Sequence, residues 1–231
     1  MRPTYNRKTS PKVIGGHVQR KNNHTKTARL GYVVDRVRPS RGYIHVVSKK
    51  EIHDFTDIIP DWEKVSEGIE SIFLDQEDEY TDGYYRHFEN EGTGVIWLCA
   101  WPKDLWVEHS EAYYQEHKWI LDSLGVLCEK SEKEREIESP KESNVEESEL
   151  EEHQTEPEII WTCYFTLQQA KAFTLMHIFL HELGHHVDKL RSKKKNIIRG
   201  GEPFAESYAN RRFHELWSSY VELFGNPNLS T

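Results

Sequence analysis

The segment that follows Thr166 constrains the fold of this chain more than any other. Thr166 and Gln169 have the spacing of a capping box, in which each side chain satisfies a free backbone N–H of the first helical turn. The pattern beyond them predicts a long, largely buried helix that ends in the basic run 193–195, and most of the domain is expected to pack on it. The apolar residues that recur at helical spacing are Ala170, Phe173, Met176, Ile178, Phe179, Leu180, Leu183, Val187 and Leu190.

The charges of the chain are segregated, and this limits how much of it can fold. Residues 1–50 contain 13 Lys and Arg and one acidic residue, whereas residues 129–158 contain 13 Glu and four Lys and Arg. Both 1–28 and 129–158 have few large apolar side chains, so they cannot bury enough surface to offset the entropy lost on ordering. We therefore expect a flexible basic arm at 1–28 and one domain at 29–231, interrupted by a disordered acidic insertion at 129–158.

The remaining residues predict a mixture of strands and helices. Strands are expected at 43–47, 69–74 and 94–101, where β-branched and aromatic residues cluster, and 159–165 is either a strand or the lead-in to the long helix. Helices are expected at 50–59, 61–68 and 111–124. With the long helix at its centre, this pattern favours a two-layered α+β domain with a small mixed or antiparallel sheet.

Composition also bears on the compartment of the protein. No apolar run reaches the roughly 18 to 20 residues that span a bilayer, and residues 1–30 lack the apolar core of a secretory signal. Cys99, Cys128 and Cys163 are an odd number without paired spacing, which indicates neither a disulfide framework nor a thiolate metal cluster. These features favour a reducing, cytoplasmic location without membrane contact.

The most apolar turn of the predicted helix contains three polar residues whose spacing suits a metal site. His181, Glu182 and His185 form the pattern His-Glu-x-x-His. Residues four apart share one face of a helix, so both imidazoles can reach one Zn²⁺ at about 2.0 to 2.1 Å, with Glu182 beside them to take a proton from metal-bound water. Imidazoles and a carboxylate among apolar residues are costly to desolvate unless they are paired or bind a metal. The pattern thus favours a zinc hydrolase.

A catalytic zinc usually has three protein ligands, so a third is expected elsewhere in the chain. A second helix is predicted to open with Pro203 in its first turn. Glu202 and Glu206 would share one face of that helix, and Ala205 and Ala209 are small enough for it to lie close to the first helix. One glutamate would bind zinc while its neighbour forms a hydrogen bond to a ligand histidine.

Taken together, the two motifs resemble the gluzincin zinc metallopeptidases, and most closely their lethal-factor-like branch. The resemblance rests on His-Glu-Leu-Gly-His-x-x-Asp at 181–188 and Glu-x-Phe-Ala-Glu at 202–206. It implies a small zincin-like domain, Glu202 as the third ligand and Glu206 as the residue that supports the site. The ImmA/IrrE-like peptidases, which cleave repressors, carry Glu-x-x-Ala-Asn, which 206–210 matches and which would make Glu206 the ligand. We favour Glu202, because a carboxylate at i+4 orients an imidazole more strongly than Asn210 would.

Further expectations concern residues around these motifs. The lethal-factor-like branch has a tyrosine seven residues before its glutamate to stabilise the oxyanion, and here that position is Lys195. Gluzincins commonly pair an extended substrate with a strand edge, for which 94–101 is the candidate. His177 shares the face of His181 and is expected to support a ligand or to be a hydrogen-bonded core histidine rather than a fourth ligand. His186, which projects about 100° away from the motif, is expected at the surface. Asp188 either orients an imidazole or begins the solvated end of the helix.

These features predict a zinc-dependent endopeptidase that acts on a protein or peptide substrate. His181, His185 and Glu202 would hold one Zn²⁺, Glu206 would support the site or be the alternate ligand, and Glu182 would be the general base. The alternative is a non-catalytic, zinc-stabilised regulatory or interaction module. In either case the basic arm 1–28 is either a solvated tail that confers solubility or a contact for nucleic acid, nucleic-acid-bound partners or an acidic partner, and no recognition motif accompanies it.

Overall fold

The structure is a computed structural model that describes residues 13–14, 17–18, 31–78, 81–136, 155–195 and 200–229. Its main sheet has the strand order β3-β5-β7-β6. β3, β5 and β7 run parallel, and β6 pairs antiparallel with β7 at one edge, so the sheet is mixed. The strands are β3 (Val33–Arg36), β5 (Ile69–Leu74), β7 (Thr93–Leu98) and β6 (Gly83–Phe88).

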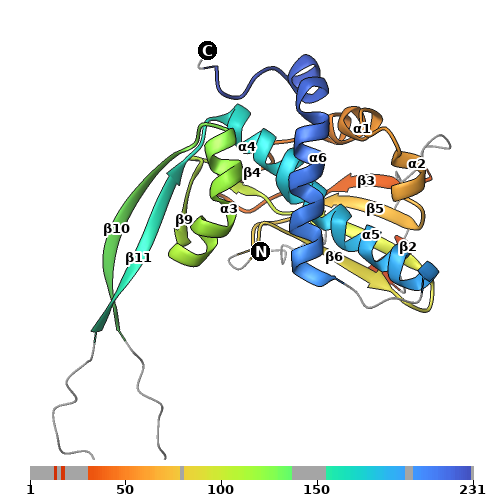
Figure 1. Cartoon of the computed structure of the whole chain (residues 1–231), viewed down its shortest axis with the longest axis horizontal. Coiled ribbons are helices and arrows are strands. Elements are labelled where there is room, and N and C mark those ends of the chain that lie inside the picture. The colour runs from red at the N-terminus through yellow and green to blue at the C-terminus, as the bar shows by residue number, and fades with distance from the viewer. Residues whose placement is uncertain are drawn as a thin grey trace, which may run out of the picture.

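One long helical run lies against this sheet, and α6 (Gly201–Phe224) packs on that run (Figure 1). The run comprises α4 (Leu167–Phe173), the π-helical segment η1 (Thr174–Phe179) and α5 (Leu180–Lys195). All residues of η1 are buried, and its apolar side chains share one core with those of β5 and β7. The expected α+β class and the central helix after Thr166 are confirmed.

Three shorter helices complete the layers around this core. α1 (Lys49–Asp57) buries Phe55, whose ring meets the ring of Phe179 edge to face at 5.6 Å. α2 (Trp62–Val65) is a single turn, and α3 (Glu111–Ser123) lies beside α4 (Figure 1). The helices expected at 50–59 and 111–124 are confirmed, and the one expected at 61–68 is shorter than predicted.

A second sheet, of order β10-β11-β9, extends from the main body (Figure 1). Its strands β10 (Leu127–Glu136), β11 (Thr155–Tyr164) and β9 (Trp106–Ser110) pair antiparallel. The disordered insertion expected at 129–158 is therefore wrong at both ends, because 129–136 and 155–158 belong to paired strands. Its middle, 137–154, lies outside the described residues.

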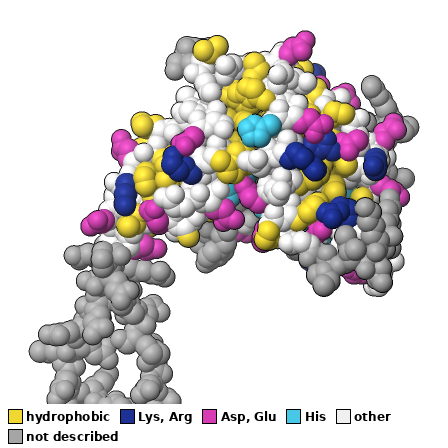
Figure 2. All heavy atoms as spheres, viewed as in Figure 1, with side chains coloured by type: hydrophobic (Ala, Val, Ile, Leu, Met, Phe, Trp, Pro, Cys, Tyr) yellow, Lys and Arg dark blue, Asp and Glu magenta, His cyan; other side chains and the backbone are white. Residues whose placement is uncertain are grey.

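Charge pairing explains how so acidic a segment forms strands. Lys133 lies opposite Glu158, and its Nζ contacts Glu108 on β9 at 2.6 Å. Opposite charges on neighbouring strands stabilise a sheet, whereas the composition of the segment alone shows only the excess of glutamate. Figure 2 shows acidic and basic side chains close together on the described part of this arm.

Cys128 and Cys163 lie opposite each other in this sheet and form a disulfide. The expectation of no disulfide is therefore wrong. The two cysteines are 35 positions apart, and it is the antiparallel pairing of β10 with β11 that brings them together. Cys99 is the free cysteine, and it is buried. The preference for a reducing cytoplasm thus loses the observation on which it depended.

The strand predicted at 94–101 differs in two respects from the structure. It is divided, because β7 ends at Leu98 and β8 (Trp101–Pro102) leaves the main sheet to pair with β4 (Tyr43–Ile44). It is also not an edge, since β7 lies between β5 and β6. The edge strand next to α5 is β6. The sequence patterns did not predict β6, β3 or β9.

Of the basic arm 1–28, the structure describes β1 (Val13–Ile14) and β2 (His17–Val18), which pair antiparallel. The flexibility expected of this arm concerns residues that otherwise lie outside the described part of the chain. Among the described helices, none is both long and apolar enough to cross a bilayer.

Candidate metal centre

Thr166 and Gln169 fix the start of the helical run that carries the histidine motif. The Thr166 side chain accepts a hydrogen bond from the Gln169 backbone N–H, and the Gln169 side chain accepts one from the Thr166 backbone N–H. The predicted capping box is confirmed. The run then passes through η1, and π-helical turns inside α-helices are frequent at functional sites. η1 carries His177, and α5 carries the His-Glu-x-x-His motif.

Two features hold the start of α6 against α5. Asp188 Oδ2 accepts hydrogen bonds from the backbone N–H groups of Gly200 (2.7 Å) and Gly201 (3.0 Å), where the helix dipole favours a carboxylate. Gly184 permits the close approach, because a Cβ there would lie 2.8 Å from the Cα of Ala205. Both expectations for Asp188 are wrong, since it is buried and neither orients an imidazole nor begins a solvated end. It places the two glutamates of α6.

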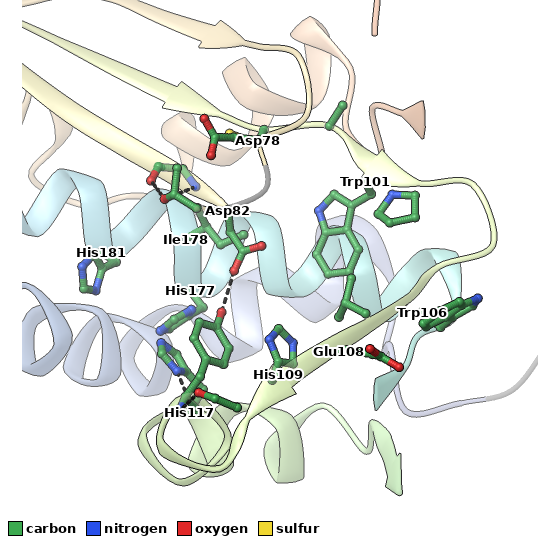
Figure 3. A pocket seen from close by; sticks show the side chains of 18 of the residues that line it. Asp78, Asp82, Trp101, Trp106, Glu108, His109, His117, His177, Ile178 and His181 are labelled. Carbon is green, nitrogen blue, oxygen red and sulfur yellow. Dashed lines mark hydrogen bonds between the residues drawn. The ribbon is translucent and has the colours of Figure 1, made fainter. Parts of the chain in front are cut away.

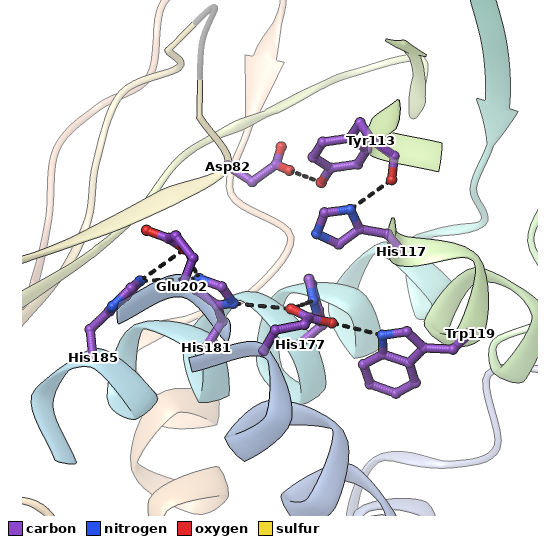
Figure 4. A network of polar contacts seen from close by, with 9 residues as sticks. Asp82, Tyr113, His117, Trp119, His177, His181, His185 and Glu202 are labelled. Atoms are coloured by element: carbon purple, nitrogen blue, oxygen red, sulfur yellow. Dashed lines mark hydrogen bonds and ion pairs between the residues drawn. The ribbon is translucent and has the colours of Figure 1, made fainter. Parts of the chain in front are cut away.

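His181, His185 and Glu202 meet where α5 and α6 lie side by side (Figure 4). His181 Nε2 lies 3.1 Å from His185 Nε2 and 3.0 Å from Glu202 Oε2, and His185 Nε2 lies 3.3 Å from Glu202 Oε2. Two ligand atoms on a tetrahedral Zn²⁺, each at about 2.0 to 2.1 Å, are about 3.3 Å apart. These three atoms, which we call the ligand triangle, therefore have the spacing of a zinc ligand set.

Glu206 lies on the opposite side of the His181 ring from Glu202. Its Oε2 is 3.1 Å from His181 Nδ1 and 3.2 Å from His177 Nε2, and its Oε1 accepts a hydrogen bond from Trp119 Nε1 at 2.7 Å. Burial acts to raise the pKa of Glu206, but the hydrogen bonds from His177 and His181 outweigh it and hold this pKa well below its usual range. The carboxylate thus stays charged and orients the His181 ring so that its Nε2 faces His185 and Glu202.

Glu182 is buried between α5 and the edge strand β6. It is 7% exposed and accepts a hydrogen bond from the backbone N–H of Tyr85. Burial raises the pKa of Glu182 to about 7, against a smaller lowering by His181. Gly83 lets β6 come this close, because a Cβ there would lie 2.6 Å from Ile178 Cγ2. A carboxyl group with this pKa can both accept and release a proton near neutral pH.

Two clefts meet at His181, Glu182 and Glu202, which line both of them. The larger has a volume of about 980 Å³ and extends past His177 toward Trp101, Trp106 and His109 (Figure 3). The smaller, of about 630 Å³, follows β6. Among the described residues, those that line the larger cleft include no Lys or Arg. Its acidic lining residues are Asp78, Asp82, Asp104, Glu108, Glu116, Glu182 and Glu202.

The histidines beside the motif have different surroundings. His177 is a buried, hydrogen-bonded core residue, as expected. The surface position expected for His186 is wrong: it is 1% exposed, with Nδ1 2.9 Å from the Tyr85 hydroxyl and Nε2 3.0 Å from the Glu67 carbonyl. Desolvation lowers the pKa of His186 to about 4, so it is neutral at pH 7. α5 is covered on this side by β6, which the sequence patterns did not predict. The side chain of Lys195 lies outside the described residues.

Three residues that surround this site were not predicted from the sequence: His117, Trp119 and Tyr85. Trp119 is 87 positions from Glu206, and the Tyr85 hydroxyl is 101 positions from the imidazole it contacts. No spacing rule connects residues so far apart. The aromatic character of α3 is visible in the sequence, but it also suits plain core packing.

Comparison of the chain with protein-family models, with curated proteins and with solved structures finds no match in any of the three. The resemblance to gluzincins remains a prediction from the two motifs. The function has to be inferred from the geometry of the site.

Proposed function

We propose that this chain is a zinc-dependent endopeptidase that hydrolyses a peptide bond in a protein substrate. The observation that carries the proposal is the ligand triangle of His181, His185 and Glu202, which lies beside the buried carboxyl group of Glu182. The Glu202 side chain is 73% exposed, and both clefts reach the triangle. Three protein ligands with an open fourth position are typical of catalytic rather than structural zinc sites.

Glu182 and Glu206 have different tasks in this proposal. Glu182 takes a proton from the attacking water and passes it to the departing amine. When bound, Zn²⁺ polarises the scissile carbonyl and lowers the pKa of its water toward about 7. Glu206 keeps the His181 ring in the orientation that ligation requires.

The edge strand β6 is the part of the molecule that best suits an extended peptide. Residues 83–87 line the smaller cleft, next to Glu182. A peptide laid along the outer edge of β6 would gain main-chain hydrogen bonds and would bring its scissile bond to the ligand triangle. A zincin-like architecture, with an antiparallel edge strand beside the metal-binding helix, belongs to the same proposal.

Two substitutions separate the parts of the proposal. Glu182→Gln should leave zinc bound and abolish cleavage of an unfolded protein substrate, because it removes the base but no ligand. His185→Ala should lose one equivalent of zinc and all cleavage. His214→Ala, at an exposed position of α6 outside the site, is the matched control and should change neither.

The outcomes of this experiment decide between two functions. Zinc content that is unchanged by His185→Ala contradicts the ligand assignment. A wild-type protein that binds zinc at the triangle but cleaves no unfolded or native protein favours the non-catalytic, zinc-stabilised module instead.

The proposal also includes contact of the basic arm 1–28 with nucleic acid. Filter binding of DNA and RNA, with and without residues 1–28, tests this point. Binding through phosphate contacts should weaken steeply as salt concentration rises and should be lost with the arm.

A further inference from the structure

A second group of metal-ligating side chains lies next to the ligand triangle and shares none of its residues. It consists of His117 on α3, His177 on η1 and Glu206 on α6. One ligand atom of each lies within 4.8 Å of the others. His117 and His177 line the larger cleft, which gives an ion a path from solvent. Figure 4 shows the ring of His117 next to His177, and their centroids are 4.8 Å apart.

Both imidazoles have a ring nitrogen available. His117 Nδ1 lies 2.8 Å from the carbonyl oxygen of Tyr113, so Nδ1 carries the proton and Nε2 keeps its lone pair. His177 is 3% exposed, and its Nδ1 is buried without a hydrogen-bond partner among the described residues. Its Nε2 lies 3.2 Å from Glu206 Oε2. Buried polar atoms are nearly always paired, so an unpaired imidazole nitrogen points to a missing partner.

Hydrogen bonds from neighbouring groups orient these side chains, as is usual for metal ligands. The Tyr113 carbonyl fixes the ring of His117, and Trp119 Nε1 donates to Glu206 Oε1, which leaves Oε2 directed at the histidines. His177 Nε2 donates a hydrogen bond to Glu206 Oε2 at 3.2 Å, which fixes this ring and leaves Nδ1 as its nitrogen with a free lone pair. The three residues come from three different helical segments packed in one core, so the arrangement is not a property of one exposed loop.

We propose that His117, His177 and Glu206 form a second divalent-cation site. Imidazoles suit Zn²⁺ and its neighbours Co²⁺ and Ni²⁺, whereas Ca²⁺ and Mg²⁺ prefer oxygen ligands alone. The site goes beyond the proposed function, because neither Glu182 nor the ligand triangle requires it. The two sites adjoin through Glu206, whose Oε2 lies between His177 and His181.

The proposal is tested by the zinc content of the full chain. Metal-free protein is dialysed to equilibrium against Zn²⁺ and its zinc is measured by mass spectrometry. The wild type should bind two equivalents, His117→Ala one, His185→Ala one, and the double variant none. His109→Ala is the matched control: this histidine also lines the larger cleft and stacks on Tyr113, but it belongs to neither site, so two equivalents should remain.

Each other outcome has a distinct meaning. One equivalent in the wild type that is lost with His185→Ala but not with His117→Ala, or two equivalents that survive His117→Ala, overturns the second site. A loss with His117→Ala but not with His185→Ala leaves the second site intact and contradicts the ligand triangle, so failures of the two proposals can be told apart.

A measurement on the wild type alone does not depend on whether the variants fold. Co²⁺ titration of the metal-free chain, followed by visible absorption, should show a break at two equivalents. A single break at one equivalent contradicts the presence of two sites, and the zinc content of His117→Ala and His185→Ala then shows which of the two is wrong.

Discussion

The ligand triangle and the His117, His177 and Glu206 group have similar chemistry but opposite surroundings. The triangle is open, with Glu202 73% exposed, and its residues come from two consecutive helices. The second group is less exposed, with the His177 side chain 4% and the Glu206 side chain 18% exposed, and its residues come from α3, η1 and α6. The comparison teaches that exposure separates a site able to admit substrate from one that holds an ion within the core.

Substitution of the two glutamates should give the largest difference between the groups. In a His117→Ala background, which removes the second site, Glu202→Ala should abolish tight zinc binding because it deletes a ligand. Glu206→Gln should weaken zinc binding only about 10- to 100-fold, since it removes a group that orients His181. Competition with a zinc chelator measures both. Equal losses would show that Glu206 is itself a ligand, as the ImmA/IrrE-like pattern implies.

Gly184→Ala should disturb both groups at once, because it separates α5 from α6. Its Cβ would lie 2.8 Å from the Cα of Ala205, a backbone atom that cannot rotate away. We expect a loss of about 1 to 3 kcal/mol in the free energy of unfolding, measured with urea, together with weaker zinc binding at both sites. Glu222→Ala, at an exposed position of α6, is the control and should be nearly neutral. A stabilised Gly184→Ala protein would mean that the helices are farther apart than described.

The acidic lining of the larger cleft should affect substrate choice but not zinc binding. Peptides with Lys or Arg near the scissile bond should be cleaved faster than matched peptides with Glu, by up to about tenfold at low salt. Asp104→Asn and Glu116→Gln should reduce this preference, and added salt should reduce it further. Cleavage that is indifferent to peptide charge would exclude the larger cleft as the substrate path.

Acid should destabilise the long helical run that carries His177, His181 and His185, because it removes an ion pair on α4, the first segment of that run. Glu51 on α1 forms an ion pair with Lys171 on α4 and accepts a hydrogen bond from the backbone N–H of Ser48. Burial acts to raise the pKa of Glu51, but these contacts outweigh it and the pKa is lowered from 4.5. The stabilisation is therefore present above the unfolded-state pKa and is lost as pH falls through the folded-state pKa. We expect a contribution of about 1 kcal/mol or less.

Urea unfolding of the wild type and of Glu51→Gln between pH 7 and pH 3 measures this contribution. The variant should be less stable at pH 7, and the two curves should converge in acid. A constant difference across this range would show that the carboxylate charge is not involved.

Local spacing made the ligand triangle and the central helix predictable from the sequence. His181 and His185 are four apart on an apolar helix, so short-range geometry relates these two. Spacing left the third ligand open between Glu202 and Glu206, and the preference for Glu202 came from the resemblance to the gluzincins. The same rule failed for His186, because its burial depends on β6, whose alternation of aromatic and polar residues was not recognised. His117 and Trp119 reach the site only through tertiary packing of α3.

The second sheet, of order β10-β11-β9, could not be predicted from composition. Composition predicted disorder at 129–158, yet the register of β10 with β11 places Lys133 opposite Glu158 and joins Cys128 to Cys163. Lys133 also reaches Glu108 on β9, the third strand of this sheet. Average composition says nothing about register, and register decides which charges and thiols meet. The α+β class survived these errors because the central helix and β5 alone define the layers.

Anomalous diffraction at the zinc edge, from crystals of the full chain grown with Zn²⁺, tests the central claim most directly. We expect a peak about 2.0 to 2.2 Å from His181 Nε2, His185 Nε2 and a carboxylate oxygen of Glu202, with Glu206 accepting a hydrogen bond from His181 Nδ1. A well-ordered structure with no peak at this triangle, or with a peak there that Glu202 does not coordinate, would contradict it.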